Sequence, residues 1–253
     1  MSAARRLALI AGVLYLVTFV TSIPALLLKA PRLNDPDFVL GAGGHGGVLW
    51  AGFLEVLLAF ACIGNAVVLY PVARRQSETA ALGFVGARVL EAAVILVGVF
   101  SLLAVVTLRQ DLAGNAGADQ GALLAAGAAL VAVHDWTFLL GPGLIPAVNA
   151  LCLGYVLYRS GLVPRIIPAL GLIGAPLLAA SATATMFGVW DQVSVFSTIA
   201  VVPIFLWELS LGIWLVAKGF DPKALARLGW ATNEPIDLSA QPATQHVGDS
   251  AGA

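Results

Sequence analysis

Long apolar segments alternate with short polar ones along the chain, and this pattern predicts membrane-spanning helices. A helix that crosses about 30 Å of hydrocarbon needs about 20 mostly apolar residues. Six segments meet this requirement, at residues 7–28, 48–70, 80–107, 138–158, 165–188 and 194–217. Before the fourth, "ALLAAGAALVAV" is apolar but too short to cross. We therefore expect an all-α bundle of six transmembrane helices, with a short extra helix before the fourth span.

The composition supports an integral membrane protein. Hydrophobic residues make up 60% of the 253 residues and charged residues 11%, whereas charged residues make up about a quarter of soluble domains. The apolar stretch from Leu7 to Leu28 exceeds the 7–15 residues of a secretory signal, so we interpret it as a retained first span. With a net charge of −1, nothing indicates a nucleic acid, and the lipid bilayer is the expected partner.

The distribution of lysine and arginine predicts the orientation, because cytoplasmic loops are enriched in these residues. With both termini inside, the cytoplasmic side carries nine of them and the outer side three, the latter being Lys29, Arg32 and Arg109. Residues 1–220 then form a single transmembrane domain. We expect residues 221–253 to be a cytoplasmic tail, largely disordered after one or two amphipathic turns in "DPKALARLGW".

An internal similarity appears when the chain is shifted by 88 residues. The segment "ALGFVGARVLEAA" at 81–93 then aligns with "ALGLIGAPLLAAS" at 169–181, with seven of thirteen positions identical. True duplication would make spans two and three and spans four and five two copies of one hairpin, entering from the same side. Chance similarity between apolar segments is the alternative, and the sequence does not decide between them.

Three ionisable residues lie at similar depth inside predicted spans: Arg88 and Glu91 on one face of span three, and Glu208 in span six. Charges inside a membrane are costly and usually face the interior of the bundle. We expect Arg88 to pair with Glu91, Glu208 or both. The cluster is interpreted either as an ion pair that fixes helix packing or as a proton or solute site near the midplane.

A second group of polar residues is expected at the outer side. In "HDWTFLLGPG", residues 134–143, Trp136 fits an interfacial anchor, and His134 and Asp135 are expected to touch water. The alternative is an outer cavity that also gathers His45, Glu55 and Asp191. Side chains of these types bind divalent metals or relay protons, but their spacing matches no metal motif, so no metal and no cofactor are expected.

Prolines and glycines mark candidate helix breaks at Gly141, Pro142, Gly143 and Pro176. Proline cannot donate the helical hydrogen bond, so such a break either lines a cavity or starts a helix. Asn65 and Asn149 are expected to hydrogen-bond between helices.

The segments "RRLALIAGVLYLVTF", "HDWTFLLGPGLIPAVNALCLGYVLYRSGLVPR" and "LGLIGAPLL" resemble a bacterial family of small multi-pass membrane proteins, domain-of-unknown-function family 4386. The resemblance runs from about Arg5 to Phe220. It implies a protein of the bacterial cytoplasmic membrane with an undescribed biochemical role, and it supplies no catalytic residues.

Three classes of function follow from these features. The intramembrane charges and helix breaks favour transport of a small solute, or an ion- or proton-coupled process. A structural or partner-binding membrane protein is the first alternative. A membrane-embedded enzyme would need the outer residues His45, Glu55, His134 and Asp135 to form one pocket. Protein partners and the small-molecule ligand are left open.

Overall fold

Helices form nearly all of the chain that the structure describes. The computed structural model describes residues 1–33, 35, 38–40, 44–112 and 119–230. The helices in these ranges are α1 (Ala3–Leu33), α2 (Gly46–Ala73), α3 (Glu78–Leu112), α4 (Gln120–Leu140), α5 (Ile145–Ser160), α6 (Ile166–Met186), α7 (Val195–Ala217) and α8 (Pro222–Arg227). The prediction of an all-α fold is confirmed.

Six segments are long and apolar enough to cross a membrane, as the hydropathy pattern predicted. Five are single helices, and one is the joined pair α4 and α5, from Gln120 to Ser160. The extra helix before span four is longer than expected: α4 has 21 residues and ends at Leu140, so the predicted start of span four at residue 138 lies in its last turn. The protein is a multi-pass membrane protein.

The helices form a closed ring. Each of α1, α2, α3, α5, α6 and α7 packs against the next in this order, and α7 returns to pack against α1. Two glycines allow this closure, because a Cβ atom on Gly12 of α1 would lie 2.8 Å from the carbonyl oxygen of Gly212 on α7. The backbones of α1 and α7 therefore approach closely, as small residues permit in membrane bundles.

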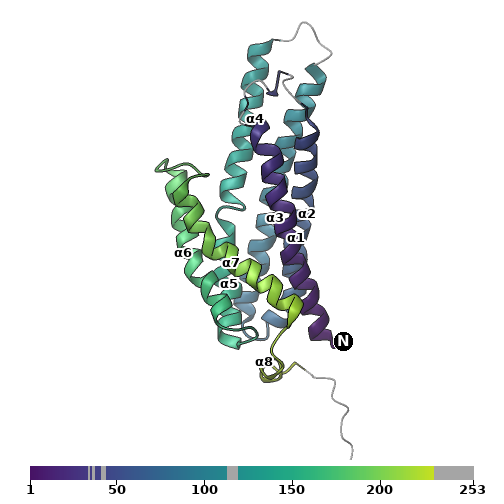
Figure 1. The fold of residues 1–253 in the computed structure, drawn as a ribbon, viewed down its shortest axis with the longest axis vertical. Coiled ribbons are helices and arrows are strands. Elements are labelled where there is room, and N and C mark those ends of the chain that lie inside the picture. The colour runs from purple at the N-terminus through teal and green to yellow at the C-terminus, as the bar shows by residue number, and fades with distance from the viewer. Residues whose placement is uncertain (34, 36–37, 41–43, 113–118, 231–253) are drawn as a thin grey trace, which may run out of the picture.

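The helices differ in length, so some of them extend beyond the others at one end of the bundle. Helices α6 and α7 have 21 and 23 residues, about 32 and 35 Å at 1.5 Å per residue, close to the hydrocarbon thickness. Helix α3 has 35 residues, or about 52 Å. In Figure 1 the ends of α1, α2 and α3 extend past the α6–α7 connection, and α4 lies along this extension.

The surface is apolar where lipid is expected. Phe60, Ile173 and Ile199, on three different helices, are each more than 60% exposed. Monomeric soluble proteins rarely expose such broad apolar surface, so these side chains fit a hydrocarbon environment. The buried core includes Trp207 of α7, whose indole ring packs against Gly171 of α6, where a Cβ atom would come within 2.7 Å of the ring.

The basic end of the bundle carries the N-terminus, the α2–α3 and α5–α6 turns, and α8, which all lie at one end in Figure 1. The two turns also fit the internal similarity, since Glu78 starts α3 and Ile166, 88 residues later, starts α6. Duplication itself stays a prediction. The expected disorder of the tail concerns residues 231–253, which lie outside the described residues; α8 accounts for the expected amphipathic turns.

Candidate functional site

The predicted charge cluster forms in the middle of the ring. Arg88 and Glu91 lie three residues apart on α3, and Glu208 projects from α7. Arg88 is ten residues from the start of α3 at Glu78, or about 15 Å, and Glu208 is nine residues from the end of α7, or about 14 Å. Both ends belong to the basic side of the bundle, so the cluster lies at roughly half the depth of a 30 Å hydrocarbon layer.

Arg88 binds both carboxylates at once. Its Nη1 atom lies 3.0 Å from Oε2 of Glu91, and its Nη2 atom forms an ion pair with Oε1 of Glu208. The residues Arg88 and Glu91 are 2% and 4% exposed, so the pairing is inside the protein. The prediction that Arg88 pairs with one or both glutamates is confirmed.

Neighbouring side chains complete the cluster. Asn149 of α5 donates a hydrogen bond of 2.6 Å from Nδ2 to Oε2 of Glu91, which confirms its expected interhelical role. The ring of Tyr15 lies 5.4 Å from the guanidinium carbon of Arg88. Asn65, by contrast, is buried with neither side-chain atom hydrogen-bonded among the described residues.

Several polar atoms around Arg88 are buried without a hydrogen-bond partner among the described residues. They are Nε of Arg88, the hydroxyl of Tyr15 and Oδ1 of Asn149. Buried polar groups of native proteins are nearly always paired with protein or water. The cluster therefore has unused hydrogen-bonding capacity as well as charge.

A cavity of about 180 Å³ adjoins the cluster at the centre of the ring. Every segment of the ring contributes to its wall: α1 through Thr18, Phe19 and Ser22, α2 through Leu58 and Cys62, α3 through Arg88, Glu91 and Ile95, the α4–α5 junction and α5 through Pro142 and Pro146, α6 through Leu178, and α7 through Val201, Ile204, Phe205 and Glu208. This volume holds several water molecules or one small solute.

The charges facing this cavity do not balance. One guanidinium faces two carboxylates, which leaves a formal net charge of −1 in an apolar environment when both carboxylates are ionised. An uncompensated buried charge is strongly unfavourable. The cluster is neutral when it holds one proton or one small cation.

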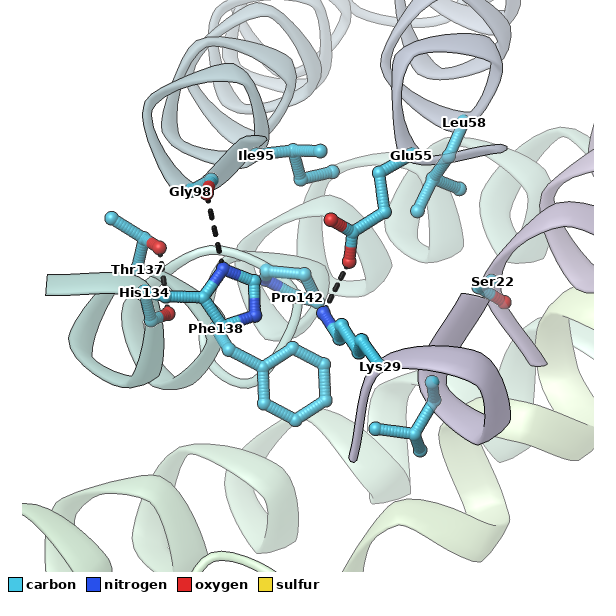
Figure 2. Close-up of a pocket in the computed structure, with 11 residues that line it drawn as sticks. Ser22, Lys29, Glu55, Leu58, Ile95, Gly98, His134, Thr137, Phe138 and Pro142 are labelled. Carbon is cyan, nitrogen blue, oxygen red and sulfur yellow. Dashed lines mark hydrogen bonds and ion pairs between the residues drawn. The ribbon is translucent and has the colours of Figure 1, made fainter. Parts of the chain in front are cut away.

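A second charged site lies further along the bundle, and Figure 2 shows its side chains. Lys29 of α1 forms an ion pair with Oε1 of Glu55 on α2, and both side chains are at most 10% exposed. The Nζ atom of Lys29 also lies 4.9 Å from the centre of the Phe138 ring. With His134 these residues line a pocket of about 40 Å³, room for one or two water molecules.

His134 faces into this pocket from α4. Its Nδ1 atom donates a 3.1 Å hydrogen bond to the backbone oxygen of Gly98, because a carbonyl oxygen can only accept. In a neutral imidazole the other ring nitrogen is then an acceptor, and it points into the pocket on the side of Lys29 (Figure 2). The expectation that His134 touches water is wrong, since it is only 4% exposed.

Glycine at position 98 explains how α4 comes so close to α3. A Cβ atom there would lie 2.6 Å from the hydroxyl oxygen of Thr137, so any larger residue would force the two helices or the Thr137 side chain to shift. Since Gly98 is seven residues beyond Glu91 on α3, the outer pocket lies about 10.5 Å further along the helix axis than the cluster.

The two cavities share part of their walls. Ser22, Leu58, Ile95 and Pro142 line both the central cavity and the outer pocket. Ser22 belongs to α1, Leu58 to α2 and Ile95 to α3, so three helices run continuously from one site to the other. The two charged sites therefore lie on either side of these four shared lining residues.

The predicted break at Gly141, Pro142 and Gly143 separates α4 from α5. The amide of Gly141 still bonds to the oxygen of Thr137 at 2.8 Å, but the regular helix does not resume until Ile145. A Cβ atom on Gly141 would lie 2.8 Å from that same oxygen, so the turn requires glycine there. No such interruption occurs at Pro176, because α6 continues through it.

The remaining outer candidates do not join the pocket. His45 precedes α2 and lies 3.4 Å from the amide nitrogen of Gln110, Asp135 is exposed as expected, and Asp191 is exposed in the α6–α7 connection. Only Glu55 and His134 of the five line the outer pocket. In the part of the chain that the structure describes, no group of three or more His, Cys, Asp and Glu residues could hold a metal ion.

Sequence reasoning missed Lys29 as a member of this site. The residue directly follows the predicted first span, and it was counted with the cations of the outer loops. The structure continues α1 to Leu33, which places Lys29 in the helix and 2% exposed. The sign that could have revealed it is its position directly after the predicted span at residues 7–28, because α1 continues five residues beyond that span.

Residues 10–219 match the model of a family described as "Domain of unknown function (DUF4386)". The chain belongs to this family. No curated protein and no solved structure shows a significant match to the chain. The DUF4386 match covers both charged sites and the Gly-Pro-Gly break, so these features lie within the family domain, and the description of the family assigns them no activity.

Proposed function

We propose that this DUF4386 protein carries a small cation, a proton or an ammonium-type ion, across the membrane through the cavity beside Arg88. The observation that carries the proposal is the charge imbalance there: Glu91 and Glu208 face one guanidinium, and a cavity adjoins the excess carboxylate. A packing ion pair needs only one carboxylate. The second one is a binding group for a positive charge.

The walls of the cavity also favour a cation. The rings of Phe19 and Phe205 pack edge to face with centroids 5.0 Å apart, and both line the cavity. Aromatic faces attract cations, and the attraction strengthens when water is excluded. The carboxylate of Glu208, 15% exposed, is the most accessible acidic group of the cluster.

The outer pocket supplies a second station for the same charge. The ring nitrogen of His134 that does not bond to Gly98 presents a lone pair to the pocket, and Glu55 holds a buried carboxylate oxygen, Oε2, without a hydrogen-bond partner among the described residues. The two cavities share four lining residues, so we propose that a proton or small cation moves the roughly 10 Å between them. Proton relays in membrane proteins use chains of Asp, Glu and His residues.

The test is a flux measurement on the full-length protein in liposomes that enclose a pH-sensitive dye. A potassium diffusion potential, negative inside, drives proton entry, and a parallel assay follows uptake of methylammonium. We expect flux with the wild type, at least tenfold lower flux with Glu208→Gln, and wild-type flux with Glu78→Gln. Glu78 is exposed in the first turn of α3, so its change is a matched loss of one carboxylate.

Two results would contradict the proposal. One is that neither ion moves faster than in protein-free liposomes. The other is that folded Glu208→Gln protein transports as fast as the wild type. A structural role for the cluster predicts the first result together with a change in thermal stability for Glu208→Gln.

We also propose that the basic end faces the cytoplasm of a bacterial cell. The nine lysines and arginines counted for that side support this orientation. A cysteine replacing exposed Lys218 should react with a membrane-impermeant maleimide only after the membrane is opened, and reaction in intact cells would reverse the orientation.

A further inference from the structure

A large pocket lies at the basic end of the bundle, away from both charged sites. Its volume is about 550 Å³, and its walls come from the α5–α6 turn, the end of α7, the α7–α8 connection and α8. Four of the residues that line it are cationic: Arg165, Lys218, Lys223 and Arg227. The transport proposal uses none of them.

Hydrogen bonds fix the frame of this pocket. The amide of Asp221 donates to the backbone oxygen of Leu162 at 2.9 Å, which joins the α7–α8 connection to the α5–α6 turn. Arg75 donates from Nη1 to the oxygen of Gly229 at 2.6 Å and stacks on Trp230, which ties the end of α8 to the α2–α3 turn. The backbone segments that carry the cations are therefore held together by these contacts.

The described residues do not neutralise the cations of this pocket. Among the described residues that line it, Asp221 is the only acidic one, and its Oδ1 atom accepts the amide hydrogen of Ala224 as the N-cap of α8. None of the four cations forms a salt bridge with another described residue. The pocket therefore attracts anions.

The apolar surroundings indicate a lipid. Ile166, directly after Arg165, is 68% exposed at the start of α6, and Ile213 is 52% exposed near the end of α7. Ile166 directly follows the pocket residue Arg165 and Ile213 directly precedes the pocket residue Trp214, so exposed apolar side chains of α6 and α7 begin next to the pocket along the chain. If the bound anion is a lipid headgroup, its acyl chains would lie near the exposed apolar side chains of α6 and α7.

We propose that this pocket binds the phosphodiester headgroup of an acidic phospholipid, with the acyl chains along α6 and α7. Cationic pockets between transmembrane helices suit such headgroups. The lining residue Lys218 is ten residues beyond Glu208, or about 15 Å along the helix axis, and none of the lining residues belongs to the central cavity. The lipid proposal can therefore be tested independently of transport.

The experiment measures lipid binding to the full-length protein in detergent by native mass spectrometry. The probes are phosphatidylglycerol and phosphatidylcholine with identical acyl chains, and the variant is Lys218→Gln/Arg227→Gln. Each basic residue near a charged membrane surface contributes about a fivefold factor in affinity, so the double variant should bind the first phosphatidylglycerol about twenty-five-fold more weakly. The control, Arg74→Gln/Arg159→Gln, removes two exposed cations at the same end that do not line the pocket.

The expected result is tighter binding of phosphatidylglycerol than of phosphatidylcholine, lost in the double variant and kept in the control. Equal loss in both variants, or no loss in either, overturns the proposal. Competition by glycerol phosphate at the same concentration as the lipid also overturns it, because the site would then be one for a soluble anion. If the double variant does not fold, Lys223→Gln on α8 should still weaken binding about fivefold.

Discussion

Removing Arg88 tests the charge balance inside the ring most directly. In Arg88→Met, the buried Glu91 and the partly buried Glu208 lose their shared cation, and the stacking on Tyr15 is lost as well. Breaking a buried ion pair by removing one partner destabilises proteins by about 3–5 kcal/mol. For a domain of this size each kcal/mol shifts the melting temperature by about 2–4 °C, so the loss should be about 6–20 °C.

Removing one carboxylate, in contrast, should hardly change the stability. Glu208→Gln leaves Arg88 paired with Glu91 at 3.0 Å, a balanced pair that also keeps the hydrogen bond from Asn149. We expect its unfolding free energy to stay within about 1 kcal/mol of the wild type, because the remaining charges cancel. The triple variant Arg88→Met/Glu91→Gln/Glu208→Gln should recover most of the stability lost in Arg88→Met, since neutral replacement of a buried ionic group is often tolerated.

The assay is thermal unfolding of the purified protein in detergent at pH 8, where protonation relieves the stranded carboxylates least. Arg74→Met, which removes an exposed cation at the end of α2, is the control and should change the melting temperature by at most about 2 °C. The reasoning is refuted if Arg88→Met has the same melting temperature as the control, or if the triple variant is no more stable than Arg88→Met.

Two further changes test packing and the outer pocket by the same melting measurement. Gly171→Ala should destabilise by about 1–3 kcal/mol because its Cβ would lie 2.7 Å from the ring of Trp207, whereas Gly86→Ala, with no atom within 4 Å, should be neutral or stabilising; equal effects would contradict the α6–α7 packing. Lys29→Met should cost about 3–5 kcal/mol by leaving Glu55 buried and unpaired, and Lys29→Met/Glu55→Gln should recover most of it; no recovery would contradict the ion pair.

The sequence predicted the helices and the depth of the charges because both follow from regular geometry. A fixed rise per residue places Arg88 and Glu208 at one level, and two opposite charges at one level inside a membrane pair with each other. Hydropathy likewise located the six spans, but it placed the start of span four at residue 138, whereas the apolar helical segment begins at Gln120 and is interrupted between Leu140 and Ile145.

The direction in which a side chain points was harder to predict. His134 and Asp135 are adjacent, so on a helix they point about 100° apart, and only one of them can face α3. From the sequence, both side chains were expected to contact water, but the contact with Gly98 buries His134 and leaves Asp135 exposed. That choice depends on which face of α4 packs against α3, and hydropathy carries no signal for it because α4 is apolar on most sides.

The two prolines predicted as helix breaks behave differently for a reason that concerns both charged sites. At Pro176 only one backbone donor is missing, and a transmembrane helix tolerates this loss when neighbouring groups compensate. At residues 141–143 two glycines flank the proline, and the chain turns so tightly that Gly141 cannot carry a side chain. Pro142 thereby lies on the wall of the central cavity and of the outer pocket. Any rearrangement of this junction therefore changes the lining of both sites together, as the proposed movement of a cation between them requires.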